Sequence, residues 1–459
     1  MKQEGASFWM KDIETASKEK IKEIQLYKLK KQLEYVERQS KFYREKFSRD
    51  RVSVSEVRTL DDLHSLPLTT RDEIVADQKK YGRLGNLMAT DYTDPGQTIG
   101  LTGVKISASD QPIKVIMSLS DAAFQGKLAA RGLTAVGITR SDYLYVADYP
   151  AFSLLYIDLG LGSINVGSKS VFVGMERAER NTSIFPSLFP PSVYYINPSY
   201  AKFIIPLLKK AGKKNPIRIV LGWGEPGYSI ACWRERFQEK WAEVSSSPEV
   251  KVYDVYGMTE LGFLAFECRH QNGLHGFEDA YIYEVIDPET EELLPPGGEG
   301  ELVVTHLEAR GMPLVRYRTG DITGIDDGPC PCGRSHLRLK GIKGRYSQRL
   351  NISGKTIYLS QIEDIVGRFK DYSGDFNVLI DGAQILDRLE LALAKEEVNS
   401  DLVTKMQKEL EKRLGISVLI APVKREDLLV FPHRSFKIID RKKLGFLKKE
   451  IRDQHKVED

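Results

Sequence analysis

Four short stretches of the 459-residue chain contain residue types that suit nucleotide chemistry. The first stretch combines small residues with hydroxyl groups, at Thr98, Gly100, Thr102 and Gly103. Glycines at this spacing let backbone N–H groups and threonine hydroxyls come close to phosphate oxygens. Because similar Gly–Thr turns are common in loops that bind nothing, this stretch alone predicts little.

The second stretch, Gly224, Glu225 and Pro226, follows an apolar run at 218–221 that we expect to be a strand. A glycine at the end of a strand leaves room for a planar base to lie against the backbone. Since an ordinary turn has the same composition, this pattern is also weak by itself.

The third stretch follows the expected strand 250–255 and consists of Tyr256, Gly257, Met258, Thr259 and Glu260. A hydroxyl beside a carboxylate can hold a phosphate and its Mg²⁺, because hard oxygen ligands suit that ion. Ligands of open α/β sheets bind at the carboxyl ends of strands, where these two groups would lie. The alternative is a capped turn before a loop.

The fourth stretch, residues 316–321, ends in Asp321. An aspartate after a tight turn can accept hydrogen bonds from two ribose hydroxyls. The competing interpretation is a surface Arg–Asp pair, which would contribute little to stability.

Three of the four cysteines suggest metal ligands. Cys330 and Cys332 are separated by one residue in a turn, and Cys268 lies far upstream. With one imidazole, three thiolates would form a closed tetrahedral zinc site of the structural kind. The alternative is three unrelated thiols, and the candidate histidines are His270, His275 and His336. Cys232 stands alone in an expected helix at 230–241 and is interpreted as a small buried apolar residue.

The composition is that of an ordinary globular protein and excludes several function classes. Lys and Arg number 67 and Asp and Glu number 64, so the net charge of +3 argues against nucleic-acid binding through bulk charge. No apolar run approaches the ~18 residues of a membrane span, and residues 1–12 lack the apolar stretch of a secretory signal. Four cysteines are too few for a disulfide scaffold, so a cytoplasmic location is expected.

The elements that would position these residues change in kind along the chain. Apolar residues at helical spacing predict helices over the first ninety residues, with Thr69 or Thr70 capping one of them. From about residue 98, apolar runs alternate with helical segments, which is typical of an α/β sheet with helices on its faces. The expected strands are 143–147, 170–173, 193–196, 218–221 and 250–255, and the expected helices include 120–136 and 200–211.

Two later regions differ from this pattern. Residues 281–304 predict β-hairpins with a turn at Asp287. After about residue 346, the segments 376–380, 389–392, 400–414 and 417–420 have the order β-β-α-β, which predicts a small separate α+β unit.

Taken together and in this order, the motifs resemble those of the AMP-forming adenylating enzymes, and more narrowly the phenylacetate-CoA ligase-like branch. The resemblance spans nearly the whole chain and rests on residues 42–44, 197–200, 256–260, 266–268, 273–275, 278–279, 316–321, 330–334 and 344–345. It implies an α/β fold with an adenylating domain at 1–345 and a small mobile α+β lid domain at 346–459. The adenylating domain would have a helical part (1–95), an α/β part (96–270) and a β-rich part (271–345).

The resemblance implies a two-step ligase reaction that uses ATP, Mg²⁺ and coenzyme A. The carboxylate of an acid, by default an aromatic one, attacks the α-phosphate of ATP and releases pyrophosphate. The thiol of coenzyme A then displaces AMP from the acyl-adenylate, and the small domain rotates between the two steps. Two alternatives remain open: a different acceptor, with amide formation or AMP transfer to a hydroxyl, and a nucleotide-binding relative without the chemistry. A homodimer is also expected from this branch.

The resemblance assigns roles to the first three stretches. The glycines and hydroxyls at 98–103 would cradle the pyrophosphate, and residues 224–226 would line the adenine. Tyr256 would stack on the adenine, Thr259 would touch the α-phosphate and Glu260 would hold Mg²⁺.

Four further positions receive roles in the same way. Asp321 would bind the ribose hydroxyls, and Arg345 would lie at the domain junction near the nucleotide. Lys437 would be the cation that stabilises the developing oxyanion, and Gly354 would line the pantetheine path of coenzyme A. The zinc ligands of this branch would be Cys268, His275, Cys330 and Cys332.

The chain departs from the family pattern at catalytic positions. Ile99 and Leu101 intrude into the phosphate stretch, which usually has small residues throughout. Phe436 replaces a Glu-Gly pair before the catalytic lysine, so the alternatives to Lys437 are Lys442 and Lys443. An enzyme that is slower or has a new role is therefore a further expectation.

The acyl pocket is expected after the strand 143–147. Tyr149, Phe152 and Tyr156 could pack against the flat ring of an aromatic acid. Simple core packing is an equally good interpretation of these three residues.

Overall fold

The structure is a computed structural model that describes residues 8–82, 84–89, 101–104, 113–147, 155–174, 178–382, 385–430 and 437–443. For Leu101–Val104 it describes the backbone alone. In this part of the chain, no helix is both long and apolar enough to cross a membrane.

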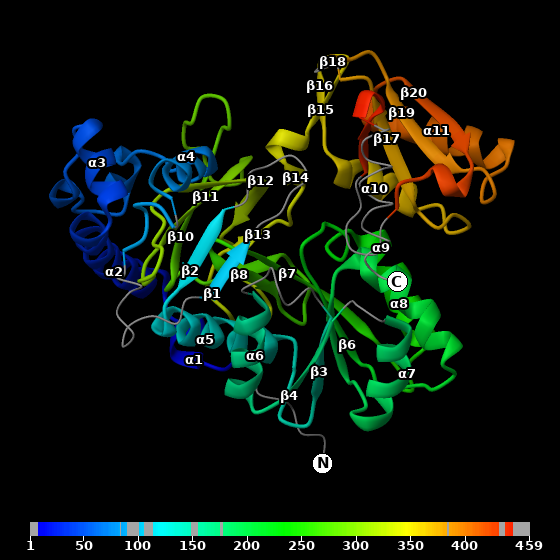
Figure 1. Ribbon diagram of the computed structural model, residues 1–459, viewed down its shortest axis with the longest axis horizontal. Helices are drawn as coiled ribbons and strands as arrows, with labels where there is room; N and C mark the ends of the chain where they lie inside the picture. The colour runs from blue at the N-terminus through cyan, green and yellow to red at the C-terminus, as the bar shows by residue number, and fades with distance from the viewer. Residues whose placement is uncertain are drawn as a thin grey trace.

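The parallel half of the main sheet has the strand order β4-β3-β5-β6-β7. Because side chains alternate along a strand, Tyr195 of β5 faces the core that includes α5 and α6, whereas Tyr194 faces the core that includes α8 and α9. Helices thus cover both faces, as the alternating pattern predicted (Figure 1). The strands are β3 (Tyr143–Ala147), β4 (Lys169–Val173), β5 (Val193–Ile196), β6 (Ile219–Gly222) and β7 (Lys251–Met258). The helices are α5 (Leu119–Ala135), α6 (Leu155–Val166), α7 (Ala178–Leu188), α8 (Pro198–Lys210) and α9 (Ala231–Glu243).

The sheet continues beyond β7 as antiparallel strands in the order β8-β9-β13-β12-β11-β10, and β14 pairs with β12. The hairpins predicted for 281–304 are confirmed as the antiparallel pair β10–β11. These strands are β8 (Gly262–Glu267), β9 (Leu274–Gly276), β10 (Tyr281–Ile286), β11 (Glu299–His306), β12 (Tyr317–Asp326), β13 (Arg338–Leu339) and β14 (Gly344–Arg345). A separate antiparallel pair is formed by β1 (Leu101–Val104) and β2 (Lys114–Met117).

Helices near the N-terminus pack against the antiparallel half. Lys28 of α2 donates to the carbonyl of Asp279, and Gln25 donates to the carbonyl of Tyr281. Thr70 caps α4 in a capping box with Glu73, which confirms one of the two predicted caps. The helices are α1 (Lys11–Glu14), α2 (Lys18–Gln39), α3 (Lys41–Arg49) and α4 (Arg71–Tyr81), and 3-10 turns lie at Val54–Glu56, Asp61–Ser65, Tyr346–Gln348, Arg425–Asp427 and Arg441–Lys443.

Residues after Arg345 form two further small sheets, and we call this unit the small domain. One sheet has the order β16-β15-β18 and the other β20-β19-β17-β21, with α10 and α11 packed on a shared core (Figure 1, upper right). The predicted β-β-α-β order is confirmed within the second sheet. The elements are β15 (Leu350–Ile352), β16 (Lys355–Ile357), α10 (Leu359–Gly367), β17 (Phe376–Ile380), β18 (Ile385–Leu386), β19 (Leu389–Ala394), α11 (Ser400–Leu414), β20 (Val418–Val423) and β21 (Ile438–Asp440).

Candidate active site

The end of β7 meets β12 and β14 at a buried polar group. The Tyr256 hydroxyl donates a hydrogen bond to Asp321 Oδ2 across 2.8 Å. Arg345 Nε lies 3.5 Å from Asp321 Oδ1, because the two residues face each other in the β12–β14 pair. Burial raises the pKa of the Tyr256 phenol well above its usual value, so the phenol is a neutral donor. Three of the predicted nucleotide residues are therefore in contact.

The turn from β7 to β8 carries Thr259 and Glu260. Glu260 is buried, and its Oε1 accepts a hydrogen bond from the Tyr317 hydroxyl at 3.0 Å. Burial also raises the pKa of the Tyr317 phenol well above its usual value, so the phenol keeps its proton and donates. The turn thus presents a half-buried hydroxyl and a buried carboxylate side by side, which are oxygen ligands of the kind that Mg²⁺ prefers.

Three neutral side chains contact the backbone of the same turn. The carbonyl of Leu261 lies 2.8 Å from the Tyr281 hydroxyl and 3.3 Å each from Gln125 Nε2 and His306 Nε2. Burial lowers the pKa of His306 to about 4, so the ring is neutral at pH 7. Gly262 has φ +78°, and a Cβ there would lie 2.5 Å from the Gln125 amide. We call Gln125, Tyr281 and His306 the turn clamp.

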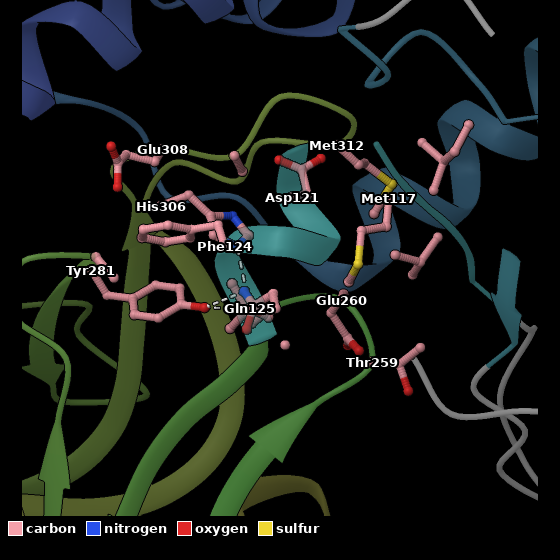
Figure 2. A pocket seen from close by; sticks show the side chains of 16 residues that line it. Met117, Asp121, Phe124, Gln125, Thr259, Glu260, Tyr281, His306, Glu308 and Met312 are labelled. Atoms are coloured by element: carbon pink, nitrogen blue, oxygen red, sulfur yellow. Dashed lines mark hydrogen bonds between the residues drawn. The ribbon is translucent and has the colours of Figure 1, made fainter. Parts of the chain in front are cut away.

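A cavity that is open to solvent lies beside this turn and contains about 450 Å³ of empty space. Figure 2 shows Thr259 and Glu260 on one side of it, with Phe124, Met117 and Met312 among the apolar groups that line the rest. Polar groups, among them the carboxylates of Asp121 and Glu308, line the rest of the cavity together with the apolar groups. A cavity where polar groups converge beside apolar walls is a usual form of a small-molecule site.

The loop after β6 has room beside its backbone. Gly224 has φ +78°, and a Cβ at this position would meet no described atom within 4 Å. Trp223 stacks on Tyr195 with ring centroids 5.6 Å apart and planes 3° from parallel. The Ser199 hydroxyl donates to Glu225 Oε2 at 2.6 Å, and burial raises the pKa of that carboxyl. Pro226 is half-buried in the same loop.

Lys437, directly before β21, lies at the junction between the two domains. Its ammonium group is paired with Glu363 of α10 and lies 4.8 Å from the ring centre of Phe376. Its charge also lowers the pKa of the nearby Glu225 carboxyl, against the larger effect of burial. The predicted cation is therefore next to the loop after β6. Lys442 is exposed on the following turn.

Several predicted residues lie elsewhere or outside the described part. Thr102 and Gly103 belong to β1, opposite Ile116 and Val115 of β2. Gly354 is exposed in the turn between β15 and β16. The positions outside the described residues are Ile99, Thr98, Gly100, Tyr149, Phe152 and Phe436.

The third predicted pocket residue, Tyr156, belongs to α6. Its ring packs on Phe172 of β4, with centroids 4.2 Å apart. It is not among the residues that line the 450 Å³ cavity.

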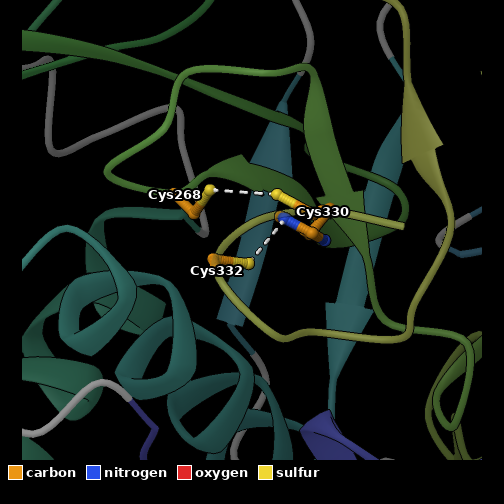
Figure 3. A group of neighbouring side chains, drawn as sticks. Cys268, Cys330 and Cys332 are labelled. Atoms are coloured by element: carbon orange, nitrogen blue, oxygen red, sulfur yellow. Dashed lines mark hydrogen bonds between the residues drawn. The ribbon is translucent and has the colours of Figure 1, made fainter. Parts of the chain in front are cut away.

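The candidate metal ligands come together from three segments. Cys268 follows β8, His275 lies in β9, and Cys330 and Cys332 lie in the loop between β12 and β13 (Figure 3). The Sγ atoms of Cys268 and Cys330 are 3.7 Å apart, and Cys332 Sγ is 3.4 Å from His275 Nε2. One ligand atom from each residue lies within 4.8 Å of all the others. Zn–S bonds of about 2.3 Å in a tetrahedron require S···S distances of about 3.8 Å, so the donor set fits zinc.

The other two candidate histidines do not join this cluster. His336 Nδ1 accepts from the N–H of Glu278 at 2.9 Å, and Nε2 contacts the carbonyl of Ile13 at 3.0 Å. His270 is exposed at the surface. His275 is thus the histidine with a nitrogen that faces the sulfurs.

The interpretation of Cys232 as a small buried apolar residue is only partly correct, because its side chain packs against the core without being fully buried. Its side chain is only half-buried, and its Sγ contacts the carbonyl of Asp364 in the small domain at 3.4 Å. The helix was predicted correctly, but the face that carries Cys232 is turned toward the small domain, which no local pattern indicates.

Sequence reasoning missed the turn clamp and Asp158. Gln125 and Leu261 are 136 residues apart, so no spacing could have connected them. Asp158 is fully buried in α6, and within the described residues neither carboxylate oxygen has a hydrogen-bond partner. Burial, with the charge of Asp121, raises the pKa of Asp158 well above its usual value. A lone carboxylate in the apolar segment 155–166 was a signal that could have revealed it.

Comparisons with known proteins agree with this geometry. Residues 354–442 match the model of the AMP-binding enzyme C-terminal domain. The phenylacetate-coenzyme A ligase of Thermus thermophilus is 28% identical over 391 residues, covering 84% of this chain and 84% of that protein.

Two solved structures of one enzyme, in different states, can be compared with the domain arrangement of this chain. 2-Hydroxyisobutyryl-CoA ligase in its postadenylation state, in complex with R3-HIB-AMP, superposes with a TM-score of 0.87 at 21% identity, covering 99% of this chain and 96% of that one. The same enzyme in its thioesterification state, with 2-HIB-AMP and CoA, gives 0.68 at 22% identity, covering 98% and 95%. Because the coverage is nearly equal, the difference in score points to the arrangement of the domains. The arrangement of this chain resembles the postadenylation state.

A large α/β domain with polar groups at its strand ends, followed by a small α+β domain, is the architecture of an acyl-adenylating enzyme. Over most of its length the chain is similar to the phenylacetate-CoA ligases, and residues 354–442 match the C-terminal domain of AMP-binding enzymes.

Proposed function

We propose that this protein activates a carboxylic acid with ATP and transfers the acyl group to coenzyme A. The observation that carries the proposal is the buried group of Tyr256, Asp321 and Arg345 beside Thr259 and Glu260. These side chains provide hydrogen-bond acceptors, a cation and oxygen ligands at the carboxyl ends of strands, where nucleotides bind in open α/β sheets.

In the first step, an acid carboxylate oxygen attacks the α-phosphorus of ATP, and pyrophosphate leaves. Asp321 would accept hydrogen bonds from the ribose hydroxyls, and Arg345 would keep Asp321 oriented. The adenine would lie along Gly224, Glu225 and Pro226, where a Cβ at Gly224 would meet no atom of the described residues within 4 Å. Tyr256 would pack against the base, with Gly257 and Met258 shaping the backbone beside it.

The anionic phosphates need positive charge in this step. Thr259 would donate its hydroxyl to the α-phosphate, and Lys437 would be the mobile cation brought by the small domain. Glu260 would hold Mg²⁺, which neutralises charge on the phosphates when it is bound. The phosphate stretch around Thr98, and Thr102 and Gly103 in β1, stay predicted parts of this cradle.

In the second step, the thiolate sulfur of coenzyme A attacks the acyl carbonyl carbon, and AMP leaves. Gly354 is exposed in the present arrangement, so its predicted place on the pantetheine path requires the small domain to rotate. We place the domain boundary at Arg345, because β14 is the last strand paired to the main sheet before the small sheets begin.

The acyl group would enter the 450 Å³ cavity next to Thr259. Phe124, Met117 and Met312 give it apolar walls that suit an aryl or a branched aliphatic acid, and an aromatic acid remains our proposal. Tyr149, Phe152 and Tyr156 stay as sequence-based predictions for this pocket.

We also propose that the four-residue cysteine and histidine cluster holds a structural zinc ion. Four protein ligands leave no open position, so this metal would tie two loops together without taking part in catalysis. Free thiols, ATP and coenzyme A are all consistent with the expected cytoplasmic location. The homodimer also stays a prediction.

The experiment that tests the proposal measures acid-dependent exchange of labelled pyrophosphate into ATP, without a thiol, over a panel of aryl and short aliphatic acids. We expect exchange with at least one acid, and a CoA thioester with that acid once coenzyme A is added. Exchange without a thioester, but with an amide or an adenylylated alcohol when those acceptors are supplied, would replace the second step. ATP binding without exchange across the whole panel would contradict the proposal.

A further inference from the structure

One tryptophan of the large domain is buried at the junction with the small domain. Trp233 of α9 is 4% exposed, and its indole Nε1–H donates to the carbonyl of Glu363 in α10 at 2.9 Å. A Cβ at Gly367 would lie 2.7 Å from the indole, and one at Gly374 would lie 1.9 Å from it. The two glycines therefore form a slot that admits the indole because neither carries a side chain.

Charged groups surround this slot on both domains. Lys202 of α8 lies 4.5 Å from the centre of the indole ring and 3.0 Å from Asp375 Oδ1 of the small domain. Arg236 lies 4.7 Å from the same ring and donates to the carbonyls of Gly367 and Tyr372. The Lys202–Asp375 pair and the hydrogen bonds of Arg236 to the two carbonyls cross the domain junction, so these contacts form only in this arrangement of the two domains.

Glu363 has two roles in this junction. Its backbone carbonyl accepts the indole hydrogen bond, and its carboxylate, which is buried, pairs with the ammonium of Lys437. Both contacts depend on one residue of α10. The hydrogen bond that docks the small domain on the indole and the ion pair that positions Lys437 therefore share one residue, Glu363.

We propose that Trp233 is a positioning residue for Lys437, and that it acts through Glu363. When the indole occupies the Gly367–Gly374 slot, α10 is fixed against α9, and the Glu363 carboxylate holds the lysine next to the loop after β6. This inference rests on the proposed function for the role of Lys437 and adds the residues that set its position.

The proposal makes the two half-reactions respond differently. The observed arrangement resembles the postadenylation state of the compared enzyme and differs from its thioesterification state. The indole contacts would thus be present around the adenylation step and absent during thioester formation. Loss of the indole should impair pyrophosphate exchange and leave thioester formation from a supplied acyl-adenylate unchanged.

The test compares Trp233→Ala, Trp233→Phe and Glu363→Gln with a matched control, Lys370→Ala. Lys370 also crosses the junction, to Glu239 at 3.1 Å, but both side chains are exposed, so the pair is worth little. Each full-length variant is assayed for pyrophosphate exchange and for thioester formation from synthetic acyl-adenylate. Thermal unfolding confirms that each variant is folded.

A second readout does not depend on activity. The ε-amine of Lys437 is labelled with an amine-acylating reagent and quantified by mass spectrometry, relative to the exposed Lys442. Lys437 is only 14% exposed, so it should react slowly in the parent protein. Removal of the indole should raise its reactivity several-fold, and Lys370→Ala should not.

For Trp233→Ala, we expect exchange to fall about tenfold or more, since removal of one positioned charge-stabilising donor costs about 10²–10³ in rate. Trp233→Phe fills the slot without the N–H donor and should lose less. Glu363→Gln keeps the carbonyl acceptor but loses the charge, so exchange should fall. A variant that combines Trp233→Ala with Glu363→Gln should be no worse than the poorer of the two single variants.

Two results would overturn the proposal: Lys437 labelling that does not change in Trp233→Ala, or an equal loss in both half-reactions in a folded variant. If the parent protein shows no exchange with any acid, the proposed function fails. The labelling experiment would still decide whether Trp233 positions Lys437.

Discussion

Tyr256 and Asp321 are joined by a hydrogen bond of 2.8 Å between two strands that are not neighbours in the sheet. Tyr256 comes from β7, where the parallel half ends, and Asp321 comes from β12 in the antiparallel half. The proposed nucleotide-binding groups of the two halves are thus fixed to each other, and such preorganisation lowers the entropic cost of binding.

The first prediction concerns Asp321→Asn. Loss of the charge weakens hydrogen bonds to the ribose hydroxyls, and such charged hydrogen bonds contribute about 1.5–3 kcal/mol. The KM for ATP should therefore rise about 10- to 100-fold, measured by pyrophosphate exchange at saturating acid. Asp326→Asn is the control, because Asp326 lies on the same strand but pairs with Arg338 near the surface. Equal effects of the two substitutions would contradict the ribose assignment.

The second prediction concerns the turn clamp. Gln125→Met keeps the length of the side chain but removes the amide that contacts Leu261. Since the turn carries Glu260, its loosening should raise the Mg²⁺ concentration for half-maximal exchange several-fold. The unpaired buried groups should also cost about 1–3 kcal/mol of stability.

Gln25→Met is a suitable control for that variant. Gln25 is also buried and donates to the carbonyl of Tyr281, but it does not contact the turn. It should lower the stability without changing the Mg²⁺ dependence. A parallel Mg²⁺ shift in both variants would show that the clamp acts only through global stability.

The third prediction concerns the metal. Protein purified without chelator should contain one zinc ion per chain by elemental analysis. Cys332→Ser should lose the zinc and unfold ~5–10 °C lower, because a structural metal contributes directly to folding free energy. Cys232→Ser should keep both the metal and the melting temperature. A Cys332→Ser variant that keeps one zinc ion would exclude this ligand set.

The fourth prediction concerns Asp158. Burial raises its pKa in the folded protein well above the value of about 3.9 that an unfolded chain would have, so folding takes up a proton. Its contribution to stability is full below the unfolded pKa and is lost as the pH rises toward the folded value. Asp158→Asn should therefore raise the melting temperature by a few degrees at pH 8 and have little effect near pH 4.

Melting curves from pH 4 to pH 8 check this sign. Asp371→Asn, at an exposed position of the small domain, should give a difference from the parent that does not change with pH. A destabilised Asp158→Asn variant at pH 8 would mean that the carboxylate has an ionic partner.

Much of the fold could be predicted from local signals. The strands 143–147 and 193–196 were predicted with the observed bounds, since apolar runs between turn residues leave few alternatives. The helix 400–414 was also predicted correctly, because Asn399 caps its start and Gly415, with φ +63°, ends it. Tyr256 and Asp321 are in contact, and the order of motifs along the chain had predicted that both residues belong to the nucleotide site.

The rest depends on contacts that have no local pattern. Trp233 and Glu363 are 130 residues apart, and the indole enters its slot only when the two domains dock. The position of Lys437 relative to the large domain also depends on how the domains dock. The sequence motif could therefore suggest Lys437 but not its pairing with Glu363. The contact of Cys232 with the small domain was not predicted for the same reason.

Arg345 belongs both to the last strand of the large domain and to the site of the predicted ribose contact. If the small domain rotates about the backbone after Arg345, a shift of Arg345 would change its contact with Asp321. Thermodynamic linkage then requires reciprocity. A nucleotide that binds one domain arrangement more tightly by a given factor shifts the equilibrium between the two arrangements toward it by the same factor. ATP, acyl-adenylate and AMP, which share one ribose but differ at the phosphate, would each set a different balance between the arrangements. The order of the reaction steps would then follow from the nucleotide that is bound, without a separate signal.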